Sequence, residues 1–318
     1  MVYAILLGLN LFLARDVAVR PMSILVTGGS GFIGRHFCES AIARGAQVTV
    51  LTRDRAKAAR FLPRGVSLYE NLNDIGNEEI FDIVVNLAGE PLGDNRWTAK
   101  RKKLFIDSRV GITERLLTFF GRRESRPKHV ISGSAVGYYG HSSVPLDESS
   151  SGSAGFSHQL CRSWEDTALG FESLGSRVCL LRTGIVLGES GALARMLPAF
   201  RMGLGGPLGD GGQYMSWIHR DDMISLINHC IEDKGIRGPV NATAPNPVTN
   251  REFASMLGAT LRRPANIRMP SVMAKALFGE MANELLLNGQ RILPTVVLEG
   301  GFVFRFPNLE SALVDLLE

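Results

Sequence analysis

The chain has 318 residues, which is enough for one sizeable hydrophobic core with a smaller lobe. Its 45% hydrophobic residues, 21% charged residues and 35 glycines are typical of a globular α/β protein. The net charge of +4 is mild, and the basic clusters at 100–103, 122–123 and 262–263 lack interleaved aromatic residues. This pattern favours solvated helix faces over a nucleic-acid surface.

The spacing of the cysteines and histidines does not match a standard metal-binding motif. Cys38, Cys161, Cys179 and Cys230 are widely spaced, which predicts a reducing, cytoplasmic compartment and no structural zinc. The six histidines show no H-E-x-x-H or similar spacing, so we expect no metal site.

Residues 1–21 differ from the rest of the chain. The apolar run "VYAILLGLNLFLA" has 13 residues, whereas a membrane span needs roughly 20. It has no basic stretch before it and no A-x-A cleavage pattern, so it is a poor secretory signal. We interpret the segment as a dispensable extension outside the fold, or as the product of an upstream start codon. A membrane anchor is the weaker alternative.

From Met22 onward, β-branched runs alternate with stretches of helical periodicity. Strands are expected near 23–29, 47–53, 81–89, 129–135 and 177–188, and helices near 32–45, 98–120 and 156–175. This alternation predicts an α/β fold with a Rossmann-like, doubly wound parallel sheet. We assign residues 22–188 to this nucleotide-binding core. A C-terminal substrate-side region follows over 189–318, with a Gly-rich loop at 203–213 and a terminal module from about 246.

The segment "TGGSGFIG" (27–34) follows the first strand and opens the first helix, which is the context that a dinucleotide site requires. Glycines at Gly28, Gly31 and Gly34 allow a tight turn and a close approach of the backbone to a pyrophosphate. The helix that begins with Phe32 and Ile33 then offers free N–H groups and the positive end of its dipole.

The end of the second strand indicates which dinucleotide binds. An NAD site places Asp or Glu about 20 residues beyond the glycines, but this strand ends with Thr52 and Arg53. Because a carboxylate would repel a 2′-phosphate and Arg would bind it, we predict NADP(H). Asp54 would weaken this preference if its side chain turned toward the ribose.

With these residues in place, the chain resembles the extended and atypical short-chain dehydrogenases/reductases, most closely the YfcH-like epimerase family. The motifs that carry the resemblance run from Met22 to the C-terminus, and they are "NLAGEPL", "SAVGYYG", "RTGIVLG", "GLGGPLGDGGQYMSWIHRDD" and "GEMANELLLNGQRILP". The resemblance implies cofactor contacts from Leu87, Ala88, Gly89 and Ile185. It also implies a contact near the cofactor phosphates from Arg109, for which a surface salt bridge is the alternative.

Active members of the wider superfamily use a Ser and a Y-x-x-x-K pair for proton transfer. Ser134 matches the Ser, but the Tyr and Lys positions fall on Ser157 and Cys161. None of the five tyrosines of the sequence is followed by Lys at the fourth position. Ser108 also stands where many relatives have Asn. The usual proton-transfer residues are therefore absent from this sequence.

Other residues are candidates for the pocket. Tyr138 or Tyr139 is the candidate proton donor beside Ser134, although packing against the ligand is the simpler role for either phenol. The candidate substrate-side residues are Glu90, Cys161, Gln213, Met215 and His219. Cys161 is more simply a small buried hydrophobe, and His219 a structural histidine. Asp222 is expected to cap the helix that follows it.

Two functions stay open on the sequence alone. One is an NADP-dependent oxidoreductase or epimerase that acts on a small carbonyl or sugar-nucleotide substrate through non-standard residues. The other is a regulatory or scaffold protein that binds NADP(H) without turnover. The resemblance also implies a homodimer through the helices that begin near Thr98 and Phe156, but the basic run at 100–103 opposes that pairing. We expect no nucleic-acid or membrane partner.

Overall fold

The computed structural model describes residues 20–318, so most of the extension predicted at 1–21 lies outside the described residues. A parallel seven-stranded sheet forms the centre of the fold. Its order is β11 (Gly238–Ala242), β7 (Arg177–Thr183), β5 (His129–Ala135), β4 (Ile83–Asn86), β1 (Ser23–Thr27), β2 (Gln47–Leu51) and β3 (Ser67–Tyr69). The predicted doubly wound parallel sheet is confirmed.

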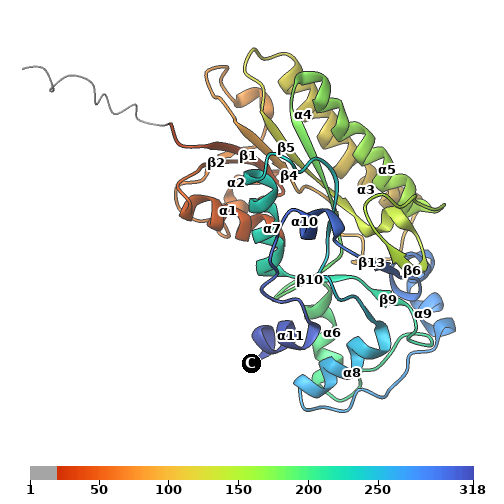
Figure 1. The fold of residues 1–318 in the computed structure, drawn as a ribbon. Helices are drawn as coiled ribbons and strands as arrows, with labels where there is room; N and C mark the ends of the chain where they lie inside the picture. Colours follow the sequence, from red (N-terminus) through yellow and green to blue (C-terminus); the bar gives the residue numbers. More distant parts are fainter. Residues whose placement is uncertain (1–19) are drawn as a thin grey trace, which may run out of the picture.

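Helices cover both faces of this sheet, as Figure 1 shows. On one face, α1 (Phe32–Ala43) and α7 (Arg220–Glu232) bury residues such as Phe37 and Ile227 against the sheet. On the other face, α4 (Ile112–Gly121) and α5 (Phe156–Leu169) form a second core. Because both faces are covered, β1 is buried at every position, as its apolar sequence predicts.

The helix expected over 98–120 contains an irregularity. It consists of α3 (Ala99–Ile106), a π-helical turn η2 (Asp107–Gly111) and α4. A π-turn adds a residue to the helix and turns the flanking side chains, and such turns are frequent at functional sites. Arg109 lies in this turn.

The strand expected over 177–188 is divided at Gly184. Its first part is β7, whereas β8 (Ile185–Leu187) leaves the sheet and pairs with β10 (Trp217–His219). A Cβ at Gly184 would lie 2.4 Å from the carbonyl oxygen of Ser216, so only glycine allows this close approach. The chain turns at this point from the sheet into the C-terminal lobe.

The lobe has its own core, built around Trp217 and side chains of three helices. These are α6 (Gly191–Arg201), α8 (Asn250–Thr260) and α11 (Leu309–Leu317). The remaining elements are α2 (Arg55–Ala58), β6 (Ser142–Leu146), β9 (Tyr214–Met215), β12 (Val248–Thr249), α9 (Ser271–Phe278), β13 (Gln290–Ile292) and α10 (Thr295–Glu299). Strand β11 comes from beyond Gly188, so strands on both sides of the predicted domain boundary share one sheet.

Within residues 20–318, every helix falls short of the length and apolarity that a membrane span requires.

Candidate functional site

The glycine turn after β1 is an open anion-binding cradle. Gly28 has φ +69°, and a Cβ there would lie 2.6 Å from the carbonyl group of Leu87. A Cβ at Gly34 would lie 2.2 Å from the carbonyl oxygen of Gly28. Helix α1 begins at Phe32, its N-cap Gly31 makes no side-chain cap hydrogen bond, and its first turn has no acidic residue. The first N–H groups of α1 are therefore available to an anion.

A buried network fixes the turn that follows β4. Thr27 Oγ1 donates to Asn86 Oδ1 at 2.6 Å, and Asn86 Nδ2 donates to Thr113 Oγ1 on α4 at 2.8 Å. The N–H of Ala88 donates to Thr27 Oγ1 at 3.3 Å. These bonds hold the segment 87–89 against the glycine turn, between the ends of β1 and β4. That Leu87, Ala88 and Gly89 contact the cofactor stays a prediction.

The residues after β2 present an exposed cation. The side chain of Arg53 is 92% exposed, and its nearest carboxylate oxygen among the described residues is Glu90 Oε2, at 3.8 Å. Asp54 points elsewhere, because its Oδ1 accepts the N–H of Lys57 and caps α2. Thr52 Oγ1 accepts the N–H of Asp54 at 3.3 Å. Asp54 is therefore occupied as a helix cap, and Arg53 is the first of the exposed cations of this turn, followed by Arg55 and Lys57.

Arg109 supplies a second cation. Its Nη1 donates to the carbonyl oxygen of Glu90 at 3.0 Å, and its guanidinium group lies 2.9 Å from the position that a Cβ on Gly89 would take. Burial lowers the pKa of Arg109 to about 10, which still leaves it charged at neutral pH. Among residues 20–318 no carboxylate lies within ion-pair distance of it. The surface salt bridge considered as the alternative for Arg109 is thus not formed within these residues.

Ser134, at the end of β5, is linked to a buried ion pair. Its Oγ donates to Glu165 Oε1 at 2.6 Å, and Arg182 donates to both carboxylate oxygens of Glu165, at 2.9 and 2.8 Å. The Glu165 and Arg182 side chains are only 6% and 4% exposed. Since a hydroxyl has a single proton and that of Ser134 is donated in the hydrogen bond to Glu165, Ser134 can only accept a further hydrogen bond.

Ser157 and Cys161, which stand at the Tyr and Lys positions of the missing pair, lie on the side of α5 that faces Ser134. Ser157 is 7% exposed, and its Oγ has no hydrogen-bond partner among the described residues. The thiol of Cys161 lies beside Ser134, and burial raises the pKa of that thiol to about 12. Cys161 is therefore a neutral thiol at physiological pH, which is typical of a packing cysteine.

The two tyrosines of "GYYG" belong to the Arg182 network. Tyr139 OH donates to Asn241 Oδ1 at 2.8 Å and accepts from Arg182 Nη1 at 2.9 Å. Burial raises the pKa of Tyr139 to about 12, against the opposing effect of Arg182. The ring of Tyr138 lies against the Arg182 guanidinium, with 3.5 Å between its centroid and Cζ. These contacts leave Tyr139 without a free hydroxyl proton.

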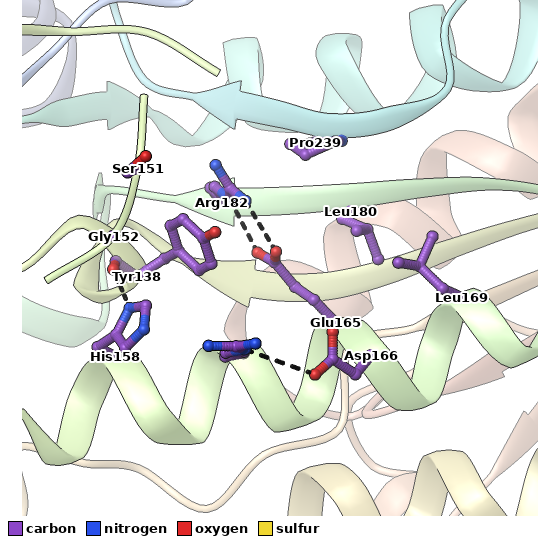
Figure 2. Close-up of a pocket in the computed structure, with 11 residues that line it drawn as sticks. Tyr138, Ser151, Gly152, His158, Glu165, Asp166, Leu169, Leu180, Arg182 and Pro239 are labelled. Carbon is purple, nitrogen blue, oxygen red and sulfur yellow. Dashed lines mark hydrogen bonds and ion pairs between the residues drawn. The ribbon is translucent and has the colours of Figure 1, made fainter. Parts of the chain in front are cut away.

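A cavity of about 510 Å³ lies on the outer side of this network, between α5, β7 and β11. Figure 2 shows the Glu165–Arg182 ion pair among the residues that line the cavity, with the ring of Tyr138 beside it. The ring Nδ1–H of His158 donates to the carbonyl oxygen of Tyr138 at 2.6 Å. The ion pair that accepts the hydrogen bond of Ser134 therefore also lines this cavity.

The substrate-side candidates of the C-terminal region are held by contacts within the protein. Gln213 Nε2 donates to the carbonyls of Leu208 and Leu286, and Met215 Sδ accepts from Asn250 at 3.2 Å. His219 is fully buried, and burial lowers its pKa.

These contacts also correct one expectation. Asp222 does not cap α7, because its carboxylate accepts the N–H groups of Arg305 and Phe306 and so holds the C-terminal segment. The cap of α7 is His219, whose Nδ1 accepts the N–H of Asp221.

The predicted cofactor contact Ile185 lies half-buried in β8 and packs against the lobe core.

Sequence reasoning missed Glu165, Arg182 and Glu284 as site residues. A signal existed for Arg182, because a charged residue inside the apolar strand "VCLLRTG" needs a buried partner. Glu284 lies in the motif "GEMANELLLNGQRILP", 127 residues beyond Ser157, and its Oε2 accepts the N–H of Ser157 at 3.2 Å. No local pattern predicts that contact.

Comparison with known proteins shows which family has this architecture. Residues 24–242 match the family model described as the NAD dependent epimerase/dehydratase family. The chain belongs to this family. Within this epimerase/dehydratase-family chain, residues 269–316 also match a domain of unknown function, DUF1731. The resemblance predicted from the motifs is confirmed.

Relatives of this epimerase/dehydratase-family chain cover almost its full length. A chloroplastic homologue of the epimerase family protein SDR39U1 from Arabidopsis thaliana is 38% identical, over 93% of this chain and 87% of the relative. Epimerase family protein YfhF of Bacillus subtilis is 33% identical, over 93% and 98%. The crystal structure of human SDR39U1 (isoform 2) with NADPH matches with a TM-score of 0.83 and 34% identity, over 93% and 99% of the two chains. A UDP-glucose 4-epimerase from Thermotoga maritima, at a TM-score of 0.75 and 20% identity, shares the fold.

Proposed function

We propose that this chain binds NADP(H) at the glycine turn and transfers a hydride between that cofactor and a small hydroxyl or carbonyl substrate. A sugar nucleotide is the first substrate class to test. The observation that carries the proposal is Arg109, a half-buried cation with no carboxylate partner among residues 20–318, beside Gly89 in the segment that packs against the glycine turn. The presence of NADPH in the human relative's structure supports the same cofactor here.

The residues present fit this cofactor. Glycine at positions 28 and 34 allows the tight turn, because a Cβ at either position would overlap backbone atoms of the protein, and the uncapped N–H groups of α1 suit a pyrophosphate. Arg53 suits a 2′-phosphate, since Asp54 is occupied as a cap. Once bound, the nicotinamide supplies the hydride chemistry. The chain's own residues then have to bind the substrate and move its proton.

Ser134 favours one direction of the reaction. Its proton is donated to Glu165, so its lone pairs accept from a substrate O–H but cannot stabilise a carbonyl oxygen. The site as folded is therefore better suited to a substrate alcohol. Oxidation of a hydroxyl is also the step that an epimerase needs first.

The test is hydride transfer with the full chain. NADP⁺ is offered with UDP-glucose, UDP-glucuronic acid and a set of secondary alcohols, and NADPH with the matching carbonyl compounds. We expect a change in NADPH absorbance with at least one alcohol. Absence of turnover across both sets, with NADPH tightly bound, would contradict the catalytic function.

The second candidate function is that of a regulatory or scaffold protein that binds NADP(H), and it corresponds to that contrary outcome. One observation favours it, namely that Ser157 and Cys161 occupy the Tyr and Lys positions and that Cys161 stays a neutral thiol. Binding without turnover would establish this function.

Replacing Arg53 with Ala should weaken NADPH binding by about ten- to a hundredfold, because one charged hydrogen bond contributes about 1.5–3 kcal/mol. NADH binding should not change, since NADH has no 2′-phosphate. Titration followed by cofactor fluorescence measures both constants. Equal losses for the two cofactors would show that Arg53 does not read the 2′-phosphate.

Replacing Glu90 with Gln should strengthen NADPH binding, whereas Arg53→Ala should weaken it. Glu90 Oε2 lies 3.8 Å from Arg53 Nη1, and it competes with a phosphate for that cation. Because an exposed ion pair contributes about 0.2–1 kcal/mol, we expect NADPH to bind up to about fivefold more tightly. The gain should vanish in the Arg53→Ala background, and a gain that persists there would refute the competition.

A further inference from the structure

We propose that Glu284 is the general base of the site and takes the substrate's hydroxyl proton in place of the absent tyrosine. The proposal rests on the oxidoreductase function proposed above. Glu284 lies in the π-helical turn η5 (Ala282–Leu287) of the C-terminal region. Its Oε2 accepts the backbone N–H of Ser157 at 3.2 Å, which places a carboxylate at the residue that aligns with the tyrosine.

Packing holds this carboxylate in position. Met281, Leu285 and Leu286 form one apolar cluster with Phe156 and Leu160 at the start of α5. The approach also depends on Gly155, whose φ is +141° and whose Cβ, if present, would lie 3.1 Å from Glu284 Oε1. The C-terminal region therefore delivers Glu284 to the N-terminus of α5 through a defined interface.

The hydroxyl of Ser157 is the second, independent observation. The residue is 7% exposed, and its Oγ is buried with no hydrogen-bond partner among the described residues. A buried hydroxyl without a protein partner leaves its hydrogen bond to a water molecule or a ligand group, and we assign the bond of Ser157 to the substrate. Ser157 Oγ lies 3.9 Å from the position that a Cβ on Gly137 would take, just after the β5 strand that carries Ser134. A substrate oxygen bound to Ser157 would lie close to Glu284.

These groups form a set suited to a substrate alcohol. Ser157 offers a hydroxyl proton to the substrate oxygen, and Glu284 offers the carboxylate to which the substrate's single O–H proton goes, so Ser134 is not the acceptor of that proton in this step. In the forward step the substrate O–H bond breaks and its proton passes to Glu284, which becomes a carboxylic acid. The C–H bond of the same carbon breaks, its hydride leaves to NADP⁺, and a C=O bond forms. The substrate is oxidised by two electrons and NADP⁺ is reduced to NADPH, while the reverse step returns both.

A helix cap alone would also explain the Glu284–Ser157 hydrogen bond, and two variants separate the roles. Glu284→Gln keeps an acceptor oxygen for the Ser157 N–H and loses the base. Glu284→Ala loses both. Glu280→Gln is the matched control, since Glu280 belongs to the same region but pairs with Lys102 at the surface, at 2.7 Å. For each full-length variant, kcat and KM are measured with NADP⁺ and the alcohol that the wild type oxidises fastest, and NADPH affinity and Tm are measured alongside.

We expect Glu284→Gln to lower kcat at least a hundredfold, as is usual when a general base is lost. Its NADPH affinity should stay within threefold of the wild type, and its Tm within about 2 °C, because the cap is kept. Glu280→Gln should match the wild type throughout. Retention of kcat within tenfold in Glu284→Gln, or a rescue of kcat in Glu284→Ala by stabilising conditions alone, overturns the base and leaves the oxidoreductase function standing. A wild type that oxidises no alcohol overturns both.

Discussion

Replacing Arg182 with Met is expected to lower the free energy of unfolding by about 3–5 kcal/mol, the loss typical of removing one partner of a buried ion pair. The Arg182 and Glu165 side chains are 4% and 6% exposed, so Glu165 would be left as a buried charge without compensation. Tyr139 would also lose the donor to its hydroxyl oxygen. Urea unfolding of the variant and the wild type measures the difference.

The double variant Arg182→Met with Glu165→Leu is the control for this prediction. Removing both charges leaves no unpaired ion, so most of the lost stability should return. Ser134 would lose its acceptor in this variant and regain a free hydroxyl proton. A loss below about 1 kcal/mol in Arg182→Met would contradict the ion pair as a structural support of the site.

Replacing Gly34 with Ala is expected to weaken NADPH binding by roughly a hundredfold, or about 2.8 kcal/mol. The added Cβ would lie 2.2 Å from the carbonyl oxygen of Gly28 and 2.8 Å from Cα of Gly29. Both contacts are backbone atoms of the turn itself, so the turn must open and the N–H groups of α1 move away from the phosphates. Cofactor fluorescence titration measures the loss, and Tm shows that the variant is folded.

Gly45→Ala is the matched control for that variant. Gly45 ends the same helix with φ +80°, but nothing lies within 4 Å of its Cβ position. The substitution should lower stability by about 1 kcal/mol through backbone strain and leave NADPH affinity unchanged. A Gly34→Ala protein that binds NADPH within threefold of the wild type would contradict the role of the glycine turn.

The parts of the site that the sequence predicted are those set by short-range geometry. The glycine spacing after a β-branched strand requires the turn seen at Gly28 and Gly34. Thr52 and Arg53 follow directly from the end of β2, so their place beside the turn needs no tertiary information. The parallel sheet likewise follows from strands that alternate with helices.

The remaining parts depend on contacts between distant segments. Glu165 and Arg182 meet because α5 packs on β7, and although Arg182 opens the motif "RTGIVLG", that motif does not show that Glu165 is its partner. Glu284 reaches Ser157 across more than a hundred residues, through an apolar cluster that forms only in the folded chain. The π-turn that carries Arg109 is invisible to helical periodicity, because its flanks read as one continuous helix.

The most direct test of the account is titration of the full-length protein with NADPH and with NADH under the same conditions. We predict that NADPH binds at least tenfold more tightly, since Arg53 is an exposed cation directly after β2 and Asp54 is occupied as a cap. Equal affinities, or no binding of either cofactor, would contradict it.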